Sequence, residues 1–600
     1  MATGSDAEWT LVGTVDSAWA TAVDPFGLVS PFAPGSRWSL DWWIGADDRW
    51  HVPSTGAVRQ RLIGAAPVVE TLVRIPGGDA VQRVYGVRGE AFANSDEWVV
   101  VEVENRSSVP FAVAFAVRPA TPEHLSALSS IAVQPVGGGR DRDPAQAVMI
   151  DGRAGLVLPR RPALAAGSAA GFDVADAVLA GDALALGGER WAGVTCGEGL
   201  ANAAFVFPVA HRTTIRLVLP LGATPGSAPA WPAVIPDADH VAAGWDAHAA
   251  QGMAAVVPDT PLGDAVAAAR RSLLLAPWSD GLRHAGPRRG RSVVRTELAD
   301  AARIVAALDR LGHHDEAART LRRWSAPLVE LGDRSPATDV FLVEAVANHR
   351  LLAEDQPLFD HLLVEAVAAI ARVERAARQG ALDPLLRSSC ARALGAMAKA
   401  LELAGQGAGA SEVRAATDRV TADREAEVSI PHGPREVLTA AAAAISAGGR
   451  EGIELLFRAL VQTSPTLTFD DHGEPHDLVS AALLLDAVRT LLVHEVDDGL
   501  ELLPVFPQRW YGGALDVHAA PTFHGRLSYA LRWHGTRPAL LWELDRRDES
   551  RSVRISVPGL DPAWATTAAR GEALLAEVVP PDVLEPLELV TEHPDAGTFS

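Results

Sequence analysis

Residues 477–510, DLVSAALLLDAVRTLLVHEVDDGLELLPVFPQRW, change from one kind of secondary structure to another within a single segment. From Asp477 to about His494 the apolar residues recur at a helical spacing, and aspartate is a residue type that caps helix starts. After Gly499, short apolar runs interrupted by prolines are typical of strands and tight turns. The segment therefore predicts the end of a helical region and the start of a β-region.

The helical region extends back from this junction to about residue 260. Segments with helical periodicity alternate with short connections throughout residues 260–498. Among them are residues 297–311, 338–353, 357–378 and 411–427. Serial antiparallel helices with short connections predict stacked hairpins, and the periodicity leaves a bundle, a solenoid and a closed toroid open.

Both ends of the chain are predicted to be β-structure. Residues 98–104 (WVVVEVE) and 111–117 (FAVAFAV) are runs of strand-forming residues bounded by turn residues, and they predict a β-sandwich over residues 1–222. Alternating runs at 527–533 and 539–544 predict a small β-domain over residues 499–600. Prolines recur from residue 225 to residue 236, which favours a linker and connecting helix over residues 223–259.

Composition and charge exclude several classes of partner. The net charge is -22, whereas nucleic-acid-binding proteins present a basic surface. No run approaches the roughly 18 apolar residues of a membrane helix. The first residues lack a basic stretch followed by an apolar one, and Cys196 and Cys390 lie far apart in sequence, which fits a reducing compartment. We therefore expect a cytoplasmic location, with no nucleic-acid or membrane partner, and the oligomeric state stays open.

No cofactor or metal is predicted. A glycine-rich phosphate loop ends in a lysine, but the only lysine, Lys399, lies within a helical segment. His472 and His476 are four residues apart, yet a glycine and a proline between them argue against the helix that would let them share an ion. A further histidine-rich group is interpreted as a surface junction between helices: His313, His314 and Asp315.

Three stretches carry a resemblance to the six-hairpin glycosidases, the superfamily of glucoamylase, trehalase and maltose phosphorylase. Residues 300–317 are similar to a helix that follows Arg-Asp-Gly-Ala-Tyr and ends Leu-Gly in that superfamily. Residues 339–351 resemble its helix ending Tyr-Arg-Leu, although the Trp-Asp-Gly-Asn-Gly-Gln stretch before that helix is missing. Residues 502–510, LLPVFPQRW, look like the start of its C-terminal sandwich.

The resemblance implies a fold and two sugar-binding candidates. The implied fold class is multidomain β + α, with an N-terminal β-sandwich, a central (α/α)6-type helical toroid and a small C-terminal β-sandwich. Asp300 takes the place of a sugar-binding aspartate, and Asp339 begins the second matching helix. Both are candidate substrate-binding residues.

The catalytic carboxylates of the superfamily are only weakly matched. Inverting hydrolysis needs a carboxylic acid and a carboxylate base roughly 6.5–9.5 Å apart. In the region of the acid, Asp383 is the one carboxylate, and Pro384 after it equally favours a helix cap. Where some relatives have Trp-Pro-Glu before the last helix, residues 464–466 are Ser-Pro-Thr. Asp471 and Glu474 follow and are candidate bases, with a solvated turn as the alternative.

Residues 38–50 combine tryptophans with charged side chains. Aromatic rings stack on sugar faces while charged groups bond hydroxyls, so this mixture is a candidate sugar-binding site. A tryptophan-rich sandwich core is the alternative. The candidate substrate-binding residues here are Trp42, Trp43, Arg49 and Trp50.

Three functions follow from these patterns. The first is a carbohydrate-related protein on a glycoside hydrolase scaffold, with hydrolysis reduced or lost and a glycan-binding or regulatory role. The second is an active inverting glycoside hydrolase acting on glucosides or a related oligosaccharide. The third is a structural or partner-binding protein without a sugar ligand. A cavity with two suitably spaced carboxylates favours the second, and a cavity filled by apolar side chains favours the third.

Overall fold

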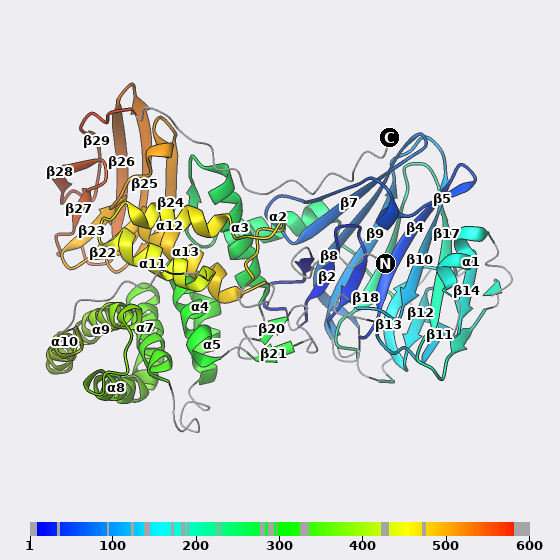
Figure 1. The fold of residues 1–600 in the computed structure, drawn as a ribbon, viewed down its shortest axis with the longest axis horizontal. Helices are drawn as coiled ribbons and strands as arrows, with labels where there is room; N and C mark the ends of the chain where they lie inside the picture. Colours follow the sequence, from blue (N-terminus) through cyan, green and yellow to red (C-terminus); the bar gives the residue numbers. More distant parts are fainter. Residues whose placement is uncertain are drawn as a thin grey trace. The chain divides into compact units, whose positions relative to one another are not determined.

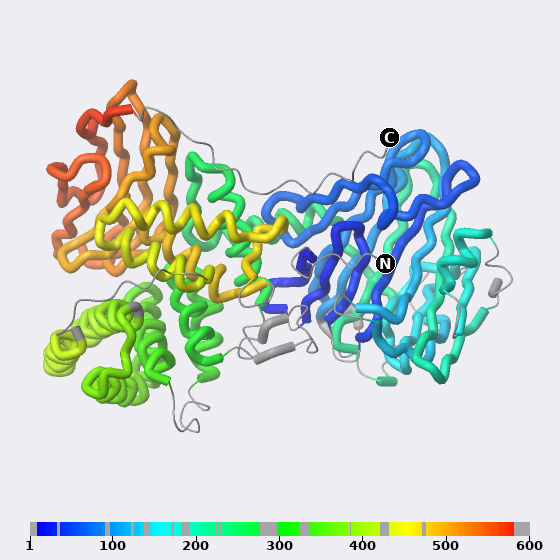
Figure 2. Tube along the Cα trace, viewed as in Figure 1, coloured from blue at the N-terminus to red at the C-terminus, as the bar shows by residue number. Residues whose placement is uncertain are grey.

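The computed structural model divides into two compact units. The first comprises Met1–Asp246 with Leu275–Pro277 and His284–Val294, and the second comprises Ala247–Leu274, Trp278–Arg283 and Arg295–Ser600. Figure 2 traces the chain through each unit. The structure describes residues 9–580 except 18, 33–35, 93–94, 122–124, 137–143, 170–172, 182–186, 189–190, 224, 227–229, 277–282, 286–292, 296, 325–334, 422–430, 432 and 471–475.

The first unit contains two antiparallel sheets of nine strands each (Figure 1). One sheet has, in spatial order, β1 (Thr10–Val12), β2 (Thr21–Val23), β3 (Val29–Pro31), β4 (Ser39–Ala46), β10 (Phe111–Arg118), β17 (Asn202–Val209), β14 (Leu164–Ser168) and β15 (Gly187–Gly188), with β5 (Arg49–His51) beside β4. The other has β16 (Gly193–Thr195), β11 (Ser130–Pro135), β12 (Gln146–Ile150), β13 (Arg153–Leu158), β18 (Thr214–Pro220), β9 (Ser95–Asn105), β8 (Gly78–Phe92), β7 (Val68–Ile75) and β6 (Val58–Leu62).

The two sheets share one apolar core, so they form a sandwich. Side chains of β4, β10 and β17 and side chains of β9 and β18 belong to the same buried cluster. Along β9, Val99, Val101 and Val103 enter this core, because alternate residues of a strand point to one face. On the same strand, Glu102 is buried and pairs with Arg83, with 3.0 Å between its carboxylate and the guanidinium.

The helices α3 to α13 belong mainly to the second unit (Figure 1). They are α3 (Thr260–Leu275), α4 (Leu298–Leu311), α5 (His314–Trp324), α7 (Pro336–Ala353), α8 (Gln356–Arg378), α9 (Pro384–Leu403), α10 (Gly407–Thr421), α11 (Pro434–Ser446), α12 (Glu451–Leu460) and α13 (Leu478–Leu492). None of the helices in the described part of the chain is both long and apolar enough to span a membrane.

Alternate helices of this unit pack against one another. Helix α4 contacts α7, α7 contacts α9, α9 contacts α11, α11 contacts α13, and α13 returns to contact α4. The intervening helices pack outside this set, with α5 on α4 and α7, α8 on α7, α10 on α9 and α12 on α11. Because each connecting helix runs back along its neighbour, α4, α7, α9, α11 and α13 begin at one end of the helical layer and end at the other.

Helix starts are fixed by residues that the sequence marks clearly. Ser335 accepts a hydrogen bond from Thr338 N ahead of α7, and Asp355 accepts one from Leu358 N ahead of α8. Asp383 and Asp477 cap α9 and α13 in the same way. Side-chain oxygens at these positions satisfy backbone N–H groups that lack a partner within the helix.

Two smaller sheets complete the second unit. The four-stranded sheet has β22 (Val493–Val496), β23 (Gly499–Leu502), β27 (Arg554–Val557) and β28 (Asp561–Thr566) in that order, with β23 and β27 parallel. The five-stranded sheet has β19 (Ala254–Val256), β24 (Leu515–Thr522), β25 (Gly525–His534), β26 (Arg537–Arg546) and β29 (Arg570–Leu574). Strand β22 follows α13 without a loop, and β24 packs against α4 and α7.

Candidate functional site

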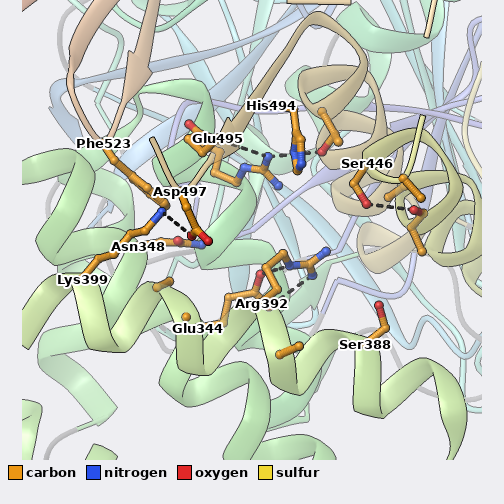
Figure 3. A pocket seen from close by; sticks show the side chains of 18 residues that line it. Glu344, Asn348, Ser388, Arg392, Lys399, Ser446, His494, Glu495, Asp497 and Phe523 are labelled. Atoms are coloured by element: carbon orange, nitrogen blue, oxygen red, sulfur yellow. Dashed lines mark hydrogen bonds and ion pairs between the residues drawn. The ribbon is translucent and has the colours of Figure 1, made fainter. Parts of the chain in front are cut away.

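A cavity of about 490 Å³ lies among the helices of the second unit, and Figure 3 shows the side chains around it. Helices α4, α7, α9, α11 and α13 contribute to it, together with β22, the turn after β22 and the turn after β24. Its polar and aromatic lining consists of Arg310, Glu344, Asn348, Ser388, Arg392, Lys399, Ser446, Thr490, His494, Glu495, Asp497 and Phe523.

The space exists because two neighbouring helices carry small side chains there. On α9 the wall includes Ala391, Gly395 and Ala396, and on α11 it includes Ala442 and Ala443. Side chains of one carbon or none cannot fill the distance between these helices. The lining residues of α4, α11 and α13 lie in the last turns of those helices, so the cavity is at the end where the inner helices finish.

Ion pairs join the charged residues of the cavity. Glu344 of α7 accepts hydrogen bonds from Arg392 of α9, at 2.6 Å and 3.3 Å. Lys399 lies 3.4 Å from the Asp497 carboxylate and donates to the Val496 carbonyl at 3.3 Å. In Figure 3, Glu344 and Arg392 lie on one wall of the cavity, and His494 and Glu495 on another.

A second set of ion pairs includes Arg310, which also lines the cavity. Arg310 pairs with Asp486 and donates to Thr490 Oγ1 at 3.2 Å. Burial alone would raise the pKa of Asp486, but Arg310 and Arg392 outweigh it and hold that pKa below its ordinary value. Glu495, likewise buried, has a lowered pKa because Arg489, 2.6 Å away, and Arg310 counter its burial.

Two lining groups remain uncharged. Burial lowers the pKa of His494, which keeps its imidazole neutral at neutral pH. The amide of Asn348, four residues after Glu344 on α7, lines the cavity and has no hydrogen-bond partner within the part of the chain that the structure describes. Asn348 therefore offers both a donor and an acceptor to a ligand.

The other end of the same helices holds two of the predicted sugar-binding residues, Asp300 and Asp339. Asp300 lies in the first turn of α4, and Arg435 of α11 donates to it at 3.1 Å. Arg435 also donates to both carboxylate oxygens of Asp477, at 2.9 Å and 2.6 Å. Asp339, in the first turn of α7, accepts two hydrogen bonds from Arg372 of α8, at 2.9 Å and 2.8 Å.

Of the predicted catalytic residues, Asp383 lies within the described structure. Asp383 is exposed and accepts a hydrogen bond from Leu386 N at 2.8 Å, which is the capping arrangement. Asp471 and Glu474 lie outside the described residues. Their roles as acid and base stay predictions.

A bacterial glucoamylase solved with acarbose bound has the same arrangement of the chain. It aligns with a TM-score of 0.53 and 8% sequence identity, over 81% of this chain and 94% of the glucoamylase. This chain has the glucoamylase fold. The resemblance inferred from the three sequence stretches is thus confirmed for the fold.

Other comparisons are weaker. A family GH92 inverting mannosidase from Bacteroides thetaiotaomicron VPI-5482 aligns with a TM-score of 0.38 and 12% identity, over 76% of this chain and 72% of that one. An α-L-rhamnosidase from Dictyoglumus thermophilum aligns with a TM-score of 0.33 and 8% identity, over 79% and 59%. No family model and no curated protein matches the chain.

Within this glucoamylase-like fold, the tryptophan cluster occupies the sandwich rather than an open surface. Trp42 is 0% exposed in the core between the sheets, and Trp43 is 1% exposed against α1 (Val174–Ala180). Neither ring offers a face to a ligand in the first unit. Trp50 is half-buried beside that second cluster, and Arg49 is exposed.

The prediction of a surface junction at the start of α5 is right in part: the group joins α4 to α5 and Asp315 is exposed, but His313 is buried. His313 is 2% exposed. His314 lies 3.0 Å from Asp309, a fully buried carboxylate that also contacts His349 at 3.0 Å. Burial would lower the pKa of His349, but Asp309 and then Asp355 raise it above its ordinary value.

The residues of the cavity were not singled out by sequence reasoning. A signal was present, because Glu344 and Asn348 are four apart and Arg392 and Lys399 are seven apart, spacings that place each pair on one helix face. The spacing within one helix does not predict which helix faces lie opposite one another in the fold.

Proposed function

We propose that this chain binds a neutral saccharide in the cavity and does not hydrolyse it. The proposal includes an (α/α)-type toroid in which α4, α7, α9, α11 and α13 form the inner layer. The glucoamylase-like fold supports a carbohydrate-related scaffold. The function of this particular chain is argued from the cavity itself.

The observation that carries the proposal is the balance of charge around an open, polar cavity. The cations Arg310, Arg392 and Lys399 face the carboxylates of Glu344, Glu495 and Asp497, three of each sign. Because they pair with one another, the cavity has no net attraction for an ion. It does have hydrogen-bonding groups on all sides, which suit the hydroxyls of a neutral sugar.

Hydrolysis lacks its acid in this cavity. An inverting glycosidase needs one carboxyl group that is protonated at the start of the reaction. The lining carboxylates are each salt-bridged, and the pKa of Glu495 is lowered rather than raised. Among the described residues, the cavity therefore presents carboxylates that serve as hydrogen-bond acceptors and not as acids.

The two alternatives make different demands. Hydrolysis would require Asp471, Glu474 or Asp383 to act at the opposite end of the inner helices, where Asp300 and Asp339 lie. A purely partner-binding protein would have no use for an open polar cavity.

The buried cysteines Cys196 and Cys390, which form no disulfide, support the proposed cytoplasmic location.

The test compares binding with turnover. Glucose, maltose and trehalose are titrated into the protein by calorimetry, and release of monosaccharide is measured in parallel. We expect one site per chain for at least one sugar, with affinity insensitive to salt because the ligand is neutral. We expect no turnover.

Asn348→Ala locates the site. Loss of one hydrogen bond costs about 0.5–1.5 kcal/mol, so affinity should fall about 2- to 13-fold. Gln406→Ala, which removes an exposed amide on the same unit, is the matched control and should change nothing. Equal binding by the two variants, or no binding by the wild type, refutes the proposal. Turnover abolished by Asp471→Asn or Glu474→Gln would establish the hydrolase instead.

A further inference from the structure

Three side chains from separate elements converge in the second unit, and none of them lines the cavity. His248 lies in the last turn of α2 (Ala238–Ala249), His313 connects α4 to α5, and Glu316 lies in the first turn of α5. One ligand atom from each lies within 4.8 Å of the other two. The two imidazole rings are stacked, with centroids 5.9 Å apart and planes inclined by 21°.

The His313 imidazole has a nitrogen without a partner in the described part of the chain. Its Nε2 is buried and has no hydrogen-bond partner among the described residues. A buried polar atom without a partner is costly, and such an atom calls for a specific explanation. Gly252 lies beside this nitrogen: a Cβ there would lie 2.4 Å from the Leu311 carbonyl oxygen and 3.1 Å from His313 Nε2, so only glycine fits.

The spacing of the other two ligand atoms suits a metal ion. His248 Nε2 lies 3.3 Å from Glu316 Oε1. Two ligands that are each about 2.0–2.2 Å from a tetrahedral zinc ion lie roughly 3.3–3.6 Å from each other. These two atoms are therefore already at the separation that a shared ion would impose.

The group carries one carboxylate, and two arginines lie near it. Glu316 is buried, and its cationic neighbour Arg319, 3.1 Å away, has a side chain that is 42% exposed and can turn into solvent. The Arg270 guanidinium also lies close to His313. Arg270 itself donates to the Met253 carbonyl at 2.6 Å.

We propose that His248, His313 and Glu316 bind a divalent transition-metal ion of the zinc class. Two imidazoles and one carboxylate are a ligand set that zinc uses, with the fourth position filled by water. The site is independent of the saccharide cavity and of any catalysis. It fixes the end of α2 against the α4–α5 connection within the second unit.

The experiment measures metal binding directly. Protein dialysed against a chelator is titrated with Co²⁺ by visible absorption and with Zn²⁺ by calorimetry. The expected result is one ion per chain, with the absorption bands of a four-coordinate cobalt site. The variants are His248→Gln and Glu316→Gln, and the matched control is His361→Gln, which replaces an exposed histidine of α8.

We expect affinity to fall at least about 10-fold in His248→Gln and Glu316→Gln, because loss of a ligand should cost no less than loss of an outer-shell partner. His361→Gln should match the wild type. His248 is partly exposed, so its variant is the one least disturbed in folding, and circular dichroism without metal verifies this. No saturable binding by the wild type, or equal affinity in His248→Gln and His361→Gln, overturns the proposal.

Discussion

Arg435 is the residue whose removal most directly tests the ion pairs at the helix starts. Its guanidinium bonds both oxygens of Asp477, which caps α13, and one oxygen of Asp300 in the first turn of α4. Arg435→Met keeps most of the side-chain volume and removes the charge. The variant therefore isolates the electrostatic link among α4, α11 and α13.

The size of the effect follows from the burial of the partners. The Asp477 side chain is 1% exposed, and removing one partner of a buried pair costs about 3–5 kcal/mol. Arg435 is 26% exposed and Asp477 keeps its bond from Ser480 Oγ at 2.7 Å, both of which reduce the cost. A fully exposed pair would contribute only about 0–1 kcal/mol. We expect Arg435→Met to lower the free energy of unfolding by about 2–3 kcal/mol at neutral pH.

The loss should depend on pH in a definite direction. Burial raises the pKa of Asp477, but Arg435 outweighs it, so the folded pKa lies below the ordinary 3.8. A depressed pKa stabilises the fold above the unfolded value, and this contribution is lost as pH falls through the folded pKa. In Arg435→Met the buried carboxylate is penalised at neutral pH and relieved by protonation. The difference between the two proteins should therefore shrink between pH 7 and about pH 4.

Urea unfolding followed by far-UV circular dichroism measures this difference. Arg419→Met is the matched control, because its ion pair with Glu374 is on the surface, with the Arg419 side chain 56% exposed. The control should lose less than about 1 kcal/mol. The reasoning fails if Arg435→Met loses no more than the control, or if its loss is the same at pH 7 and pH 4.

Substitutions at two further positions separate structural roles from functional ones. Asp383→Ala should cost about 1 kcal/mol of unfolding free energy through loss of the α9 cap, whereas Asp383→Asn retains the cap and should cost only a few tenths. If Asp383 were instead a general acid, Asp383→Asn would abolish turnover of maltose while leaving stability unchanged. Trp43→Ala should cost about 3–5 kcal/mol, because it empties a buried site, and should leave saccharide affinity measured by calorimetry unchanged. Weakened binding with unaltered stability would return Trp43 to a sugar-binding role.

Secondary structure was predictable wherever local pattern and burial agree. The run at residues 98–104 lies within β9, and the predicted helix at 338–353 is α7 from Pro336 to Ala353. The predicted helix at 411–427 in fact begins at Gly407, because packing of α10 on α9 outweighs the low helix propensity of glycine.

The end of α13 shows where pattern fails. The apolar spacing continues to about His494, but the helix ends at Leu492, and Val493–Val496 pairs with Gly499–Leu502 as a β-hairpin. That pairing is decided by residues beyond the helical pattern, around Asp498 and Gly499. It places His494 and Glu495 on a strand that lines the cavity, a position that a continued helix would not give them.

The cavity was not predictable for a related reason. Asp300 and Asp339, proposed from a resemblance that follows single helices, each stand in a first helical turn at the opposite end from the cavity, and their sugar-binding role stays a prediction. The cavity is formed by helices that are distant in sequence. Its volume comes from alanines and a glycine, and their spacing along the sequence is the same as that of small residues in any buried helix. The metal cluster likewise combines His248 with residues 65 or more positions later.

The two ends of the inner helices differ in what their carboxylates can do. Helix starts and nearby arginines both stabilise negative charge. Asp300, Asp339 and Asp477 stand at helix starts and pair with arginines, so a structural role is enough to explain an acidic residue at each position. General acid catalysis needs the opposite surroundings, namely a carboxyl group buried without a cation. In the described structure the candidate positions provide caps and salt bridges instead. Asp471 and Glu474 are the predicted catalytic residues that lie outside the described structure, and measuring turnover in their amide variants separates a saccharide-binding protein from an enzyme.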